Sequence, residues 1–472
     1  MNHNVPPRPD RPPLLQRLLN VNRAEVVPVL IAALFFFCVL TALMLLRPAR
    51  DALGMERGIE SIRWLFFGTA LATLAVNPVF GWLVARLRRL QFISATYGFF
   101  VMSLVGFWAL LVLAPEAIGQ RSGQVFYVWF SVFNLFVTMV FWALLADRFT
   151  SDQGRRFFAL ISVGGTLGAI FGPWLTSQLA EPLGTPSLLL VAGGFLLAAL
   201  AAAWLLVRVV PDRTETATAT ASSPSTAVAH ERIGGSAWAG LLAVLRSRYL
   251  TAIAGYVVLM TVLATLIYFT RLQMVAAATD DMDARAALMG NIDMWTQVAV
   301  LALQVTLTGK LIQRFGLGVA LAILPVATAL GFIGLAIYGS FVVLVLLEAT
   351  NRAVQRGITR PAREALFTVV SREDKYKAKA FVDTFMYRTG DVLGAQAEGL
   401  LGRLGLALGG LASIVVPLAI AWAAIGLWLG RAQGRHAASA ARASAFVYHP
   451  ARTRPGTGSM HASTPTSTRE ET

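Results

Sequence analysis

Apolar stretches of about 20 residues recur along the whole chain and are separated by short polar segments. A helix of about 20 apolar residues is long enough to cross the ~30 Å hydrocarbon core of a bilayer. The pattern therefore predicts an all-α polytopic membrane protein with about twelve transmembrane helices. The predicted spans lie near residues 26–46, 64–85, 91–114, 125–146, 157–180, 188–209, 249–270, 288–309, 317–338, 340–359, 381–404 and 405–430.

A polar segment rich in Thr, Ser and Ala, from Pro211 to Ser236, is the longest break between the apolar stretches. Its low hydrophobicity is typical of a flexible linker, and it separates two groups of six predicted spans. Similar basic turns follow spans two and eight, and spans four and ten, which favours two six-helix pseudo-repeats. The expected organisation is a tail at 1–25, a bundle at 26–210, a linker at 211–248, a second bundle at 249–430 and a disordered tail at 431–472.

The amino-acid composition indicates that most of this chain is surrounded by lipid rather than by water. Hydrophobic residues make up 56% of it and charged residues 14%, against about a quarter charged in a typical soluble domain. The single cysteine, Cys38, excludes a disulfide within one chain, and all five histidines lie in the predicted tails and linker. We therefore expect no haem, iron–sulfur or His-ligated metal site within the membrane, and no cofactor.

The formal net charge of +15 would suit a nucleic-acid-binding protein, but the distribution of charge has a simpler explanation. Most of the 40 Lys and Arg residues fall in the tails and in alternate connections, as the positive-inside rule predicts for the cytoplasmic side. We expect both termini in the cytoplasm, a bacterial-type inner membrane, and no nucleic-acid partner. The polar N-terminus does not resemble a cleaved signal peptide, so the first apolar run is expected to remain as an anchor.

Candidate chemistry is confined to polar residues at membrane depth. The sequence has no Walker A motif, no Cys-x-x-Cys pair and no plausible catalytic triad, which argues against an enzyme. Polar residues inside a membrane span are energetically costly and usually face a cavity. The candidates are Asn134 in span four, Asp293 and Gln297 in span eight, Glu348 and Arg352 in span ten, and Asp383, Arg388 and Asp391 in span eleven.

Two sets of candidates have the spacing of helical ion pairs. Glu348 and Arg352 are four residues apart, and Arg388 and Asp391 are three apart. Such pairs could lock the bundle, or they could contact a substrate or a coupling ion. Asn134 could equally form a helix–helix hydrogen bond. The sequence leaves these alternatives open.

Span five carries three glycines spaced by four residues, Gly164, Gly168 and Gly172. This spacing places them on one helix face, where the absence of side chains lets another helix approach closely. We interpret the face as a packing surface.

The densest charged cluster follows the first predicted span and reads Arg47-Pro48-Ala49-Arg50-Asp51. Pro48 is expected to interrupt the helix just after Arg47, which would place both arginines at the outer mouth of the protein. The cluster could be a structural turn held by an Arg47–Asp51 pair. We favour an electropositive entrance for an anion, because guanidinium groups bind phosphate and carboxylate in a bidentate geometry. Arg363 belongs to a second Arg-Pro-Ala-Arg sequence.

Several of these motifs resemble the non-mitochondrial ATP/ADP translocase family, part of the major facilitator superfamily. They are Arg47-Pro48-Ala49-Arg50-Asp51, Phe141-Trp142, Arg155-Arg156-Phe157-Phe158 and the block from Arg363 to Asp383. The resemblance implies a major-facilitator-like fold and exchange of adenine nucleotides by alternating access. Arg50-Asp51 stands where the family has Lys-Asp, Phe130 and Ser131 occupy the region of a family acid, and Asp391 replaces a family base.

The expected function is secondary transport of an organic or phosphorylated anion, with nucleotides implied by the resemblance. The expected substrate-binding residues are Arg47, Arg50, Asn134, Asp293, Gln297, Glu348, Arg352, Arg363 and Arg388, and the expected coupling residues are Asp51, Asp383 and Asp391. Two alternatives remain: a proton-coupled transporter of a non-nucleotide metabolite, and a transporter-like scaffold or sensor without flux.

Overall fold

The computed structural model describes residues 23–86, 89–114, 116–210, 237–307, 310–405 and 408–447. Within these ranges the chain consists of helices joined by short turns, which confirms the predicted all-α class. The predicted tail up to residue 22, most of the predicted linker (211–236) and residues 448–472 lie outside the described residues.

Ten helices in the described ranges contain a segment that is long and apolar enough to cross a membrane. They are α2 (Arg23–Met55), α3 (Ile59–Arg86), α4 (Arg89–Leu113), α5 (Glu116–Arg148), α6 (Ser151–Leu183), α7 (Ser187–Val209), α10 (Arg248–Ala278), α11 (Met282–Leu307), α12 (Lys310–Tyr338) and α17 (Leu408–Val447). Each contains one of the predicted spans or most of it.

The other two predicted spans, 340–359 and 381–404, are helical but interrupted. The first comprises α13 (Phe341–Val354), a π-helical turn (Gln355–Thr359) and α14 (Arg360–Leu366). After a short 3₁₀ turn (Phe367–Val369), the second comprises α15 (Arg372–Phe381), a π-helical turn (Val382–Met386) and α16 (Tyr387–Arg403). A π-helical turn holds an extra residue in the helix and often marks a functional site.

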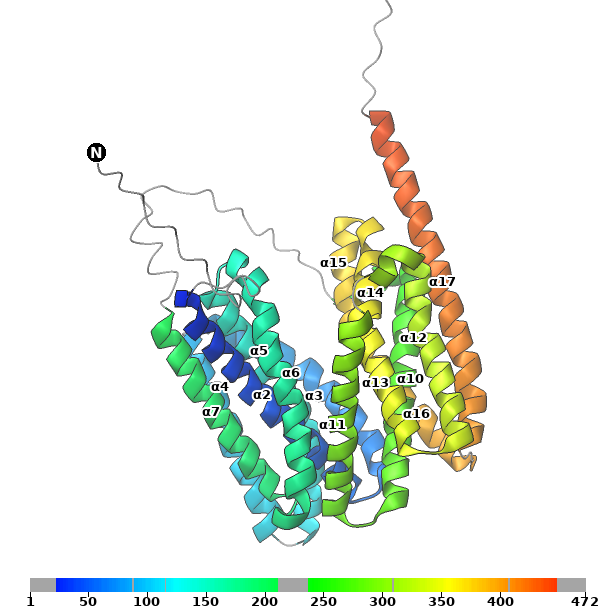
Figure 1. Ribbon diagram of the computed structural model, residues 1–472. Coiled ribbons are helices and arrows are strands. Elements are labelled where there is room, and N and C mark those ends of the chain that lie inside the picture. Colours follow the sequence, from blue (N-terminus) through cyan, green and yellow to red (C-terminus); the bar gives the residue numbers. More distant parts are fainter. Residues whose placement is uncertain are drawn as a thin grey trace, which may run out of the picture.

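The helices form two bundles (Figure 1). Helices α2 to α7 lie on one side and α10 to α17 on the other. Three helix pairs connect the bundles: α11 packs against both α6 and α2, and α16 packs against α3. We call the side of the molecule where α2 begins and α17 ends the tail side, and the other the opposite side.

The prediction that Pro48 interrupts the first helix is wrong, because α2 continues through Pro48 to Met55. Proline removes one backbone donor, which a transmembrane helix tolerates when neighbouring helices supply hydrogen bonds. Just before Pro48, the hydroxyl of Thr176, on α6, donates to the carbonyl of Leu45 at 2.8 Å, which links the two helices at this level. The arginines around Pro48 therefore lie inside the bundle rather than in a loop at its mouth.

Two segments expected to lack structure are partly helical. The end of the predicted linker forms α9 (Ala237–Arg246), and α17 continues to Val447, into the tail that was expected to be disordered from residue 431. Both segments are rich in alanine, which has the highest intrinsic helix propensity. The helical tail segment continues directly from the membrane span of α17, whereas α9 is separated from α10 by Ser247, whose backbone is extended.

The glycine face of α6 packs directly on α2, as the sequence predicts. A side chain on Gly164 or Gly168 would collide with the backbone of α2, and on Gly172 its Cβ would lie 2.6 Å from the carbonyl oxygen of Thr41. The second bundle repeats this device: on α16, a Cβ on Gly390 or Gly394 would lie about 3.0 Å from backbone oxygens of α10. In each bundle, glycine lets the fifth membrane segment approach the first.

Candidate functional site

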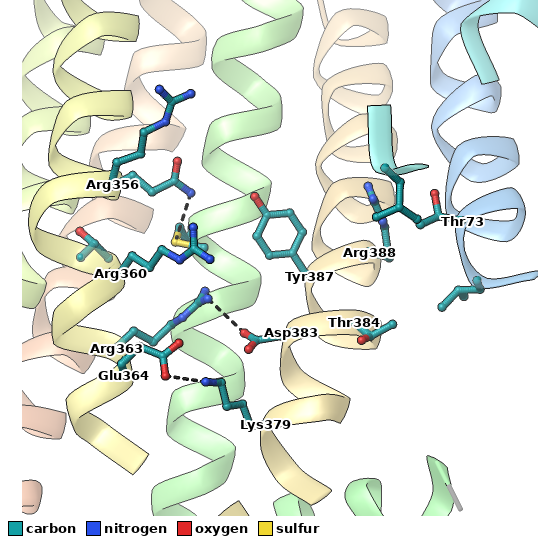
Figure 2. A pocket seen from close by; sticks show the side chains of 15 residues that line it. Thr73, Arg356, Arg360, Arg363, Glu364, Lys379, Asp383, Thr384, Tyr387 and Arg388 are labelled. Carbon is teal, nitrogen blue, oxygen red and sulfur yellow. Dashed lines mark hydrogen bonds and ion pairs between the residues drawn. The ribbon is translucent and has the colours of Figure 1, made fainter. Parts of the chain in front are cut away.

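A cavity of about 630 Å³ lies on the tail side between the bundles and is called the central cavity below. Figure 2 shows charged side chains from α14, α15 and both π-helical turns converging on it. Arg356, Arg360 and Asp383, which line it, are exposed to solvent. The cavity is therefore accessible from outside the protein.

The lining of the central cavity is strongly cationic. Its charged residues are Arg356, Arg360, Arg363, Lys379 and Arg388, with Glu364 and Asp383 as the carboxylates. All seven belong to the second bundle. The first bundle contributes Thr73, Leu74 and Leu135, which are neutral.

Some of these cations are already paired within the protein. Arg363 lies 3.0 Å from Asp383, and Lys379 lies 2.5 Å from Glu364. Within the described part of the chain, Arg356 and Arg360 form no ion pair, so their guanidinium groups have no protein carboxylate to neutralise them. These two side chains are the ones most available to an anionic ligand.

The two π-helical turns position the polar lining. Gln355, Arg356 and Thr359 come from the first turn, and Asp383 and Thr384 from the second. The extra residue in such a turn changes the direction in which the following side chains point. The site is therefore built where the helices depart from α-helical geometry.

A smaller cavity of about 170 Å³ lies deeper and shares Gln355 with the central cavity. Arg47 on α2, Arg352 on α13 and Tyr268 on α10 contribute to its wall. It therefore extends the cationic surface towards the opposite side.

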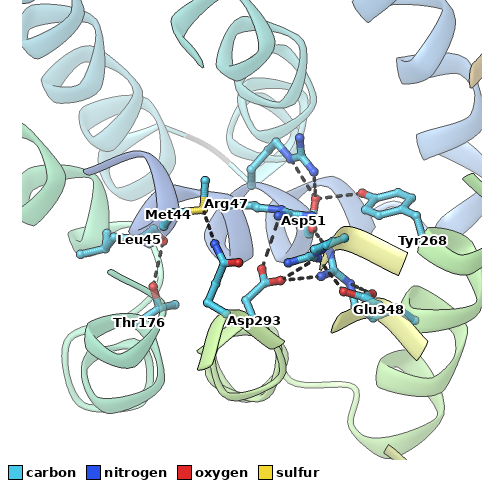
Figure 3. A network of polar contacts seen from close by, with 12 residues as sticks. Met44, Leu45, Arg47, Asp51, Thr176, Tyr268, Asp293 and Glu348 are labelled. Carbon is cyan, nitrogen blue, oxygen red and sulfur yellow. Dashed lines mark hydrogen bonds and ion pairs between the residues drawn. The ribbon is translucent and has the colours of Figure 1, made fainter. Parts of the chain in front are cut away.

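A buried charge network adjoins this smaller cavity and joins α2 to helices of the second bundle (Figure 3). At its centre is Arg271, which is 0% exposed and lies on α10. Its guanidinium nitrogens lie 2.6 Å from Asp51, 3.0 Å from Asp293 and 3.6 Å from Glu348. Arg352 shares two of these carboxylates, at 3.1 Å from Asp293 and 2.6 Å from Glu348. The network joins the first bundle, through Asp51, to the second.

Asp51 is held by several further contacts. It accepts hydrogen bonds from Arg50 Nε at 2.8 Å and from the Tyr268 hydroxyl at 2.8 Å. The Tyr268 and Tyr127 hydroxyls are 2.9 Å apart, and the Arg50 guanidinium lies 4.5 Å from the centre of the Tyr127 ring. Arg50 is thus committed to the network, through an ion pair and a cation–π contact.

A second set of contacts closes the opposite side between α3 and α16. Arg63 on α3 donates to Glu398 on α16 at 2.7 Å, and Gln273 on α10 donates to the same carboxylate at 2.6 Å. An apolar cluster from both bundles lies around this bridge and includes Met55, Ile62, Tyr127, Phe269, Leu272, Met289 and Ala395. The bundles are therefore sealed on the opposite side and separated by a cavity on the tail side.

The structure divides the predicted site residues into groups. Arg363, Arg388 and Asp383 line the central cavity, and Arg47, Glu348 and Arg352 line the smaller one. Arg50, Asp51 and Asp293 belong to the buried network. The predicted pairs Glu348–Arg352 and Arg388–Asp391 are present at 2.6 Å and 3.2 Å.

Two predicted residues lie elsewhere. Asn134 is exposed on α5 and is absent from both cavity linings, although its neighbour Leu135 lines the central one. The Gln297 amide lies 4.0 Å from the sulfur of Met44. Among the described residues, no group of three or more His, Cys, Asp or Glu is arranged to hold a metal ion.

Three arginines of these sites are not among the predicted site residues: Arg271, Arg356 and Arg360. Arg271 directly follows the predicted end of span seven at residue 270, outside the predicted membrane segment. No glycine or proline follows it before Ala278, where α10 ends, and this absence was the available signal. Arg352, Arg356 and Arg360 are spaced by four residues, a periodicity that indicates one helix face.

Comparisons with known proteins agree with this architecture. Residues 29–351 match the family model of the Major Facilitator Superfamily. The ADP,ATP carrier protein 1 of Chlamydia trachomatis serovar D is 24% identical to this chain, and the match covers 87% of this chain and 88% of that protein.

Two solved structures show the same fold at low sequence identity. The POT family transporter PepTSo has a TM-score of 0.59 and 11% identity, over 87% of this chain and 98% of that chain. A mutant of the nucleoside transporter NupG has a TM-score of 0.51 and 13% identity, over 87% of this chain and 99% of that chain.

Proposed function

The chain belongs to the Major Facilitator Superfamily of membrane transporters, and we propose that it exchanges phosphorylated anions, nucleotides in particular, by alternating access. The observation that carries this proposal is the charge of the central cavity, whose described lining has five cationic side chains and two carboxylates. Its volume of about 630 Å³ falls within the ~300–1,000 Å³ typical of small-molecule sites.

The cationic lining fits a ligand with several negative charges. Arg356 and Arg360 have no carboxylate partner within the described residues, whereas Arg363 and Lys379 are paired with Asp383 and Glu364. An entering phosphate group would bind the first two directly and compete with a carboxylate for the others. The neutral surface beside them, with Tyr387 and Leu135, suits the less polar part of the ligand.

The buried network and the Arg63–Glu398 bridge act in this proposal as the gate on the opposite side. They join the two bundles only while that side is closed, so they must separate when the cavity opens there. Arg47 and Arg352 pair with Asp293 of the network and also line the smaller cavity. A bound anion near them would attract the arginines away from Asp293, which couples ligand binding to gate opening.

We expect both termini to be cytoplasmic, in a bacterial-type inner membrane, so the described conformation would be open to the cytoplasm. Labelling of a single introduced cysteine from each side of an oriented membrane tests this topology. The Cys38→Ser variant supplies the background, because Cys38 is the only cysteine in the chain.

Binding and exchange assays on the purified protein test the substrate class. Thermal unfolding is measured with ATP, ADP, AMP, adenosine and phosphate-free organic acids. We expect stabilisation to increase with the number of phosphate groups and to be absent with adenosine. Proteoliposomes loaded with ADP should then accumulate labelled ATP, and empty ones should not.

Other outcomes identify the alternatives. Uptake driven by a pH gradient without internal nucleotide would indicate a proton-coupled transporter, and would contradict exchange. Stabilisation by adenosine equal to that by ATP would remove the cationic cavity as the basis of recognition. Absence of any flux despite binding would indicate a sensor or scaffold.

A further inference from the structure

A second sizeable cavity, of about 480 Å³, lies within the second bundle on the tail side and shares no lining residue with the central cavity. It is formed by α9 with the start of α10, the segment after the 3₁₀ turn, α15 and α17. We call it the peripheral cavity. The proposed transport cycle assigns it no role.

The peripheral cavity is basic. Arg246, Lys377 and His436 line it, and Asp374 is the one carboxylate among its described lining residues. Arg246 is exposed and forms no ion pair with any residue that the structure describes. An anionic group entering the cavity would therefore find an unneutralised guanidinium.

Its position coincides with a membrane boundary. The apolar span of α10 begins at Arg248, and that of α17 ends at Ser439. The lining residues Arg246, Tyr249 and His436 lie close to these two limits. The Tyr249 and His436 rings meet edge to face at 5.4 Å, and aromatic side chains are common at this level of a bilayer.

Helix α9 has one face packed against the protein and one face open to the surroundings. Gly240 and Val244 are buried, and a Cβ on Gly240 would lie 2.7 Å from the Lys377 carbonyl oxygen, so α9 packs tightly on α15. Leu242 and Leu245 are 50% and 64% exposed. A short amphipathic helix beside a membrane span presents such leucines to the acyl chains.

We propose that the peripheral cavity binds the phosphate headgroup of an anionic phospholipid. Arg246, Lys377 and His436 contact the phosphate, and the exposed leucines of α9 contact the acyl chains. Basic pockets between transmembrane helices at the headgroup level are suited to anionic lipids. The leucines favour a lipid over free phosphate, because free phosphate gains nothing from an apolar surface.

The test compares lipids of different charge on the purified full-length protein. Short-chain phosphatidylglycerol, phosphatidylcholine and inorganic phosphate are each titrated while thermal unfolding is followed, and native mass spectrometry counts the retained lipids. Phosphatidylglycerol should raise the unfolding temperature and be retained, whereas phosphatidylcholine and phosphate should have little effect. The double variant Arg246→Gln/Lys377→Gln should need at least about tenfold more phosphatidylglycerol for the same shift.

Arg248→Gln is the matched control, because Arg248 is exposed two residues from Arg246 but does not line the cavity. It should behave as the wild type does. If the double variant fails to fold, His436→Gln replaces it with the same expectation. Equal effects of the two lipids, an equal loss in Arg248→Gln, or full stabilisation by phosphate alone would each overturn the proposal.

Discussion

Individual charged side chains in this protein differ mainly in whether the protein already neutralises them. Arg271 is fully buried and contacts three carboxylates, whereas Arg360 is exposed in the central cavity and forms no ion pair in the described chain. Removing the charge of Arg271 therefore affects folding and gating. Removing the charge of Arg360 affects ligand binding.

Arg360→Gln should weaken nucleotide binding without destabilising the protein. A hydrogen bond to a charged group contributes about 1.5–3 kcal/mol, so the dissociation constant should rise about ten- to a hundredfold. Isothermal titration with ATP measures this change. Arg403→Gln, at an exposed arginine outside the cavity, should bind as the wild type does, and an equal loss there would contradict the assignment.

Arg271→Gln should strongly destabilise the protein, because it leaves Asp51, Asp293 and Glu348 buried with less positive charge. Breaking a buried ion pair by removing one partner costs about 3–5 kcal/mol. Thermal unfolding in detergent measures the loss, with exposed Arg121→Gln as the control. Arg271→Lys should be intermediate, since the single nitrogen of an ammonium group cannot reach carboxylates that contact three separate nitrogens of the guanidinium. Equal stability of Arg271→Gln and wild type would show that the network is not structural.

The position of Arg271 could not be predicted from the sequence, for a physical reason. Hydropathy places the end of a span where charge begins, so the predicted span stops before Arg271, although the helix continues to Ala278. The cost of burying the arginine is offset by carboxylates distant in sequence, such as Asp51, 220 residues away. A pattern within one helix carries no information about such partners.

At the level of helices, the length of the apolar stretches predicted the membrane spans reliably. The interruptions within helices could not be predicted from the sequence. The ten long apolar helices match predicted spans, because the bilayer thickness dictates helix length. The π-helical turns at Gln355–Thr359 and Val382–Met386 have no glycine or proline signature in common. They are recognised only once neighbouring helices and the cavity are in place.

Gly168→Ala tests the contact between α6 and α2. The added Cβ would collide with the Phe37 carbonyl oxygen, and overpacking typically costs about 1–3 kcal/mol. The unfolding temperature should therefore fall. Gly194→Ala is the matched control, since nothing lies within 4 Å of a Cβ there and alanine favours a helix by up to ~1 kcal/mol. A fall in Gly194→Ala as large as in Gly168→Ala would exclude close packing as the cause.

For the molecule as a whole, the sealed side and the cavity side are distinct. Contacts between the bundles, including Arg63–Glu398 and Asp51–Arg271, gather on the opposite side, and the central cavity lies on the tail side. The presence of charged groups at membrane depth was predictable from sequence. Their division into a gate and a cavity was not, because it depends on which helices meet across the bundles.

Disrupting the Arg63–Glu398 bridge should shift the protein towards opening on the opposite side. Arg63→Glu is combined with Cys38→Ser and with Met289→Cys as a reporter, since Met289 is 0% exposed in the apolar seal. Labelling from the opposite side by an impermeant maleimide should accelerate, by about tenfold for each 1.4 kcal/mol of shift.

The charge-swapped variant, Arg63→Glu with Glu398→Arg, should restore slow labelling of the same reporter. Labelling that is equally fast in the single and swapped variants would mean that the ion pair does not hold the gate. Slow labelling in all variants would assign the seal to the apolar cluster alone.

The unequal electrostatics of the two cavity walls have a mechanical consequence. Every described charge around the central cavity belongs to the second bundle, and the first bundle offers only Thr73, Leu74 and Leu135. A polyanionic ligand in the central cavity would therefore be held by charges of the second bundle, and the first bundle would move past it over an uncharged surface. Charge from the first bundle would reach the ligand only in the deeper cavity, through Arg47.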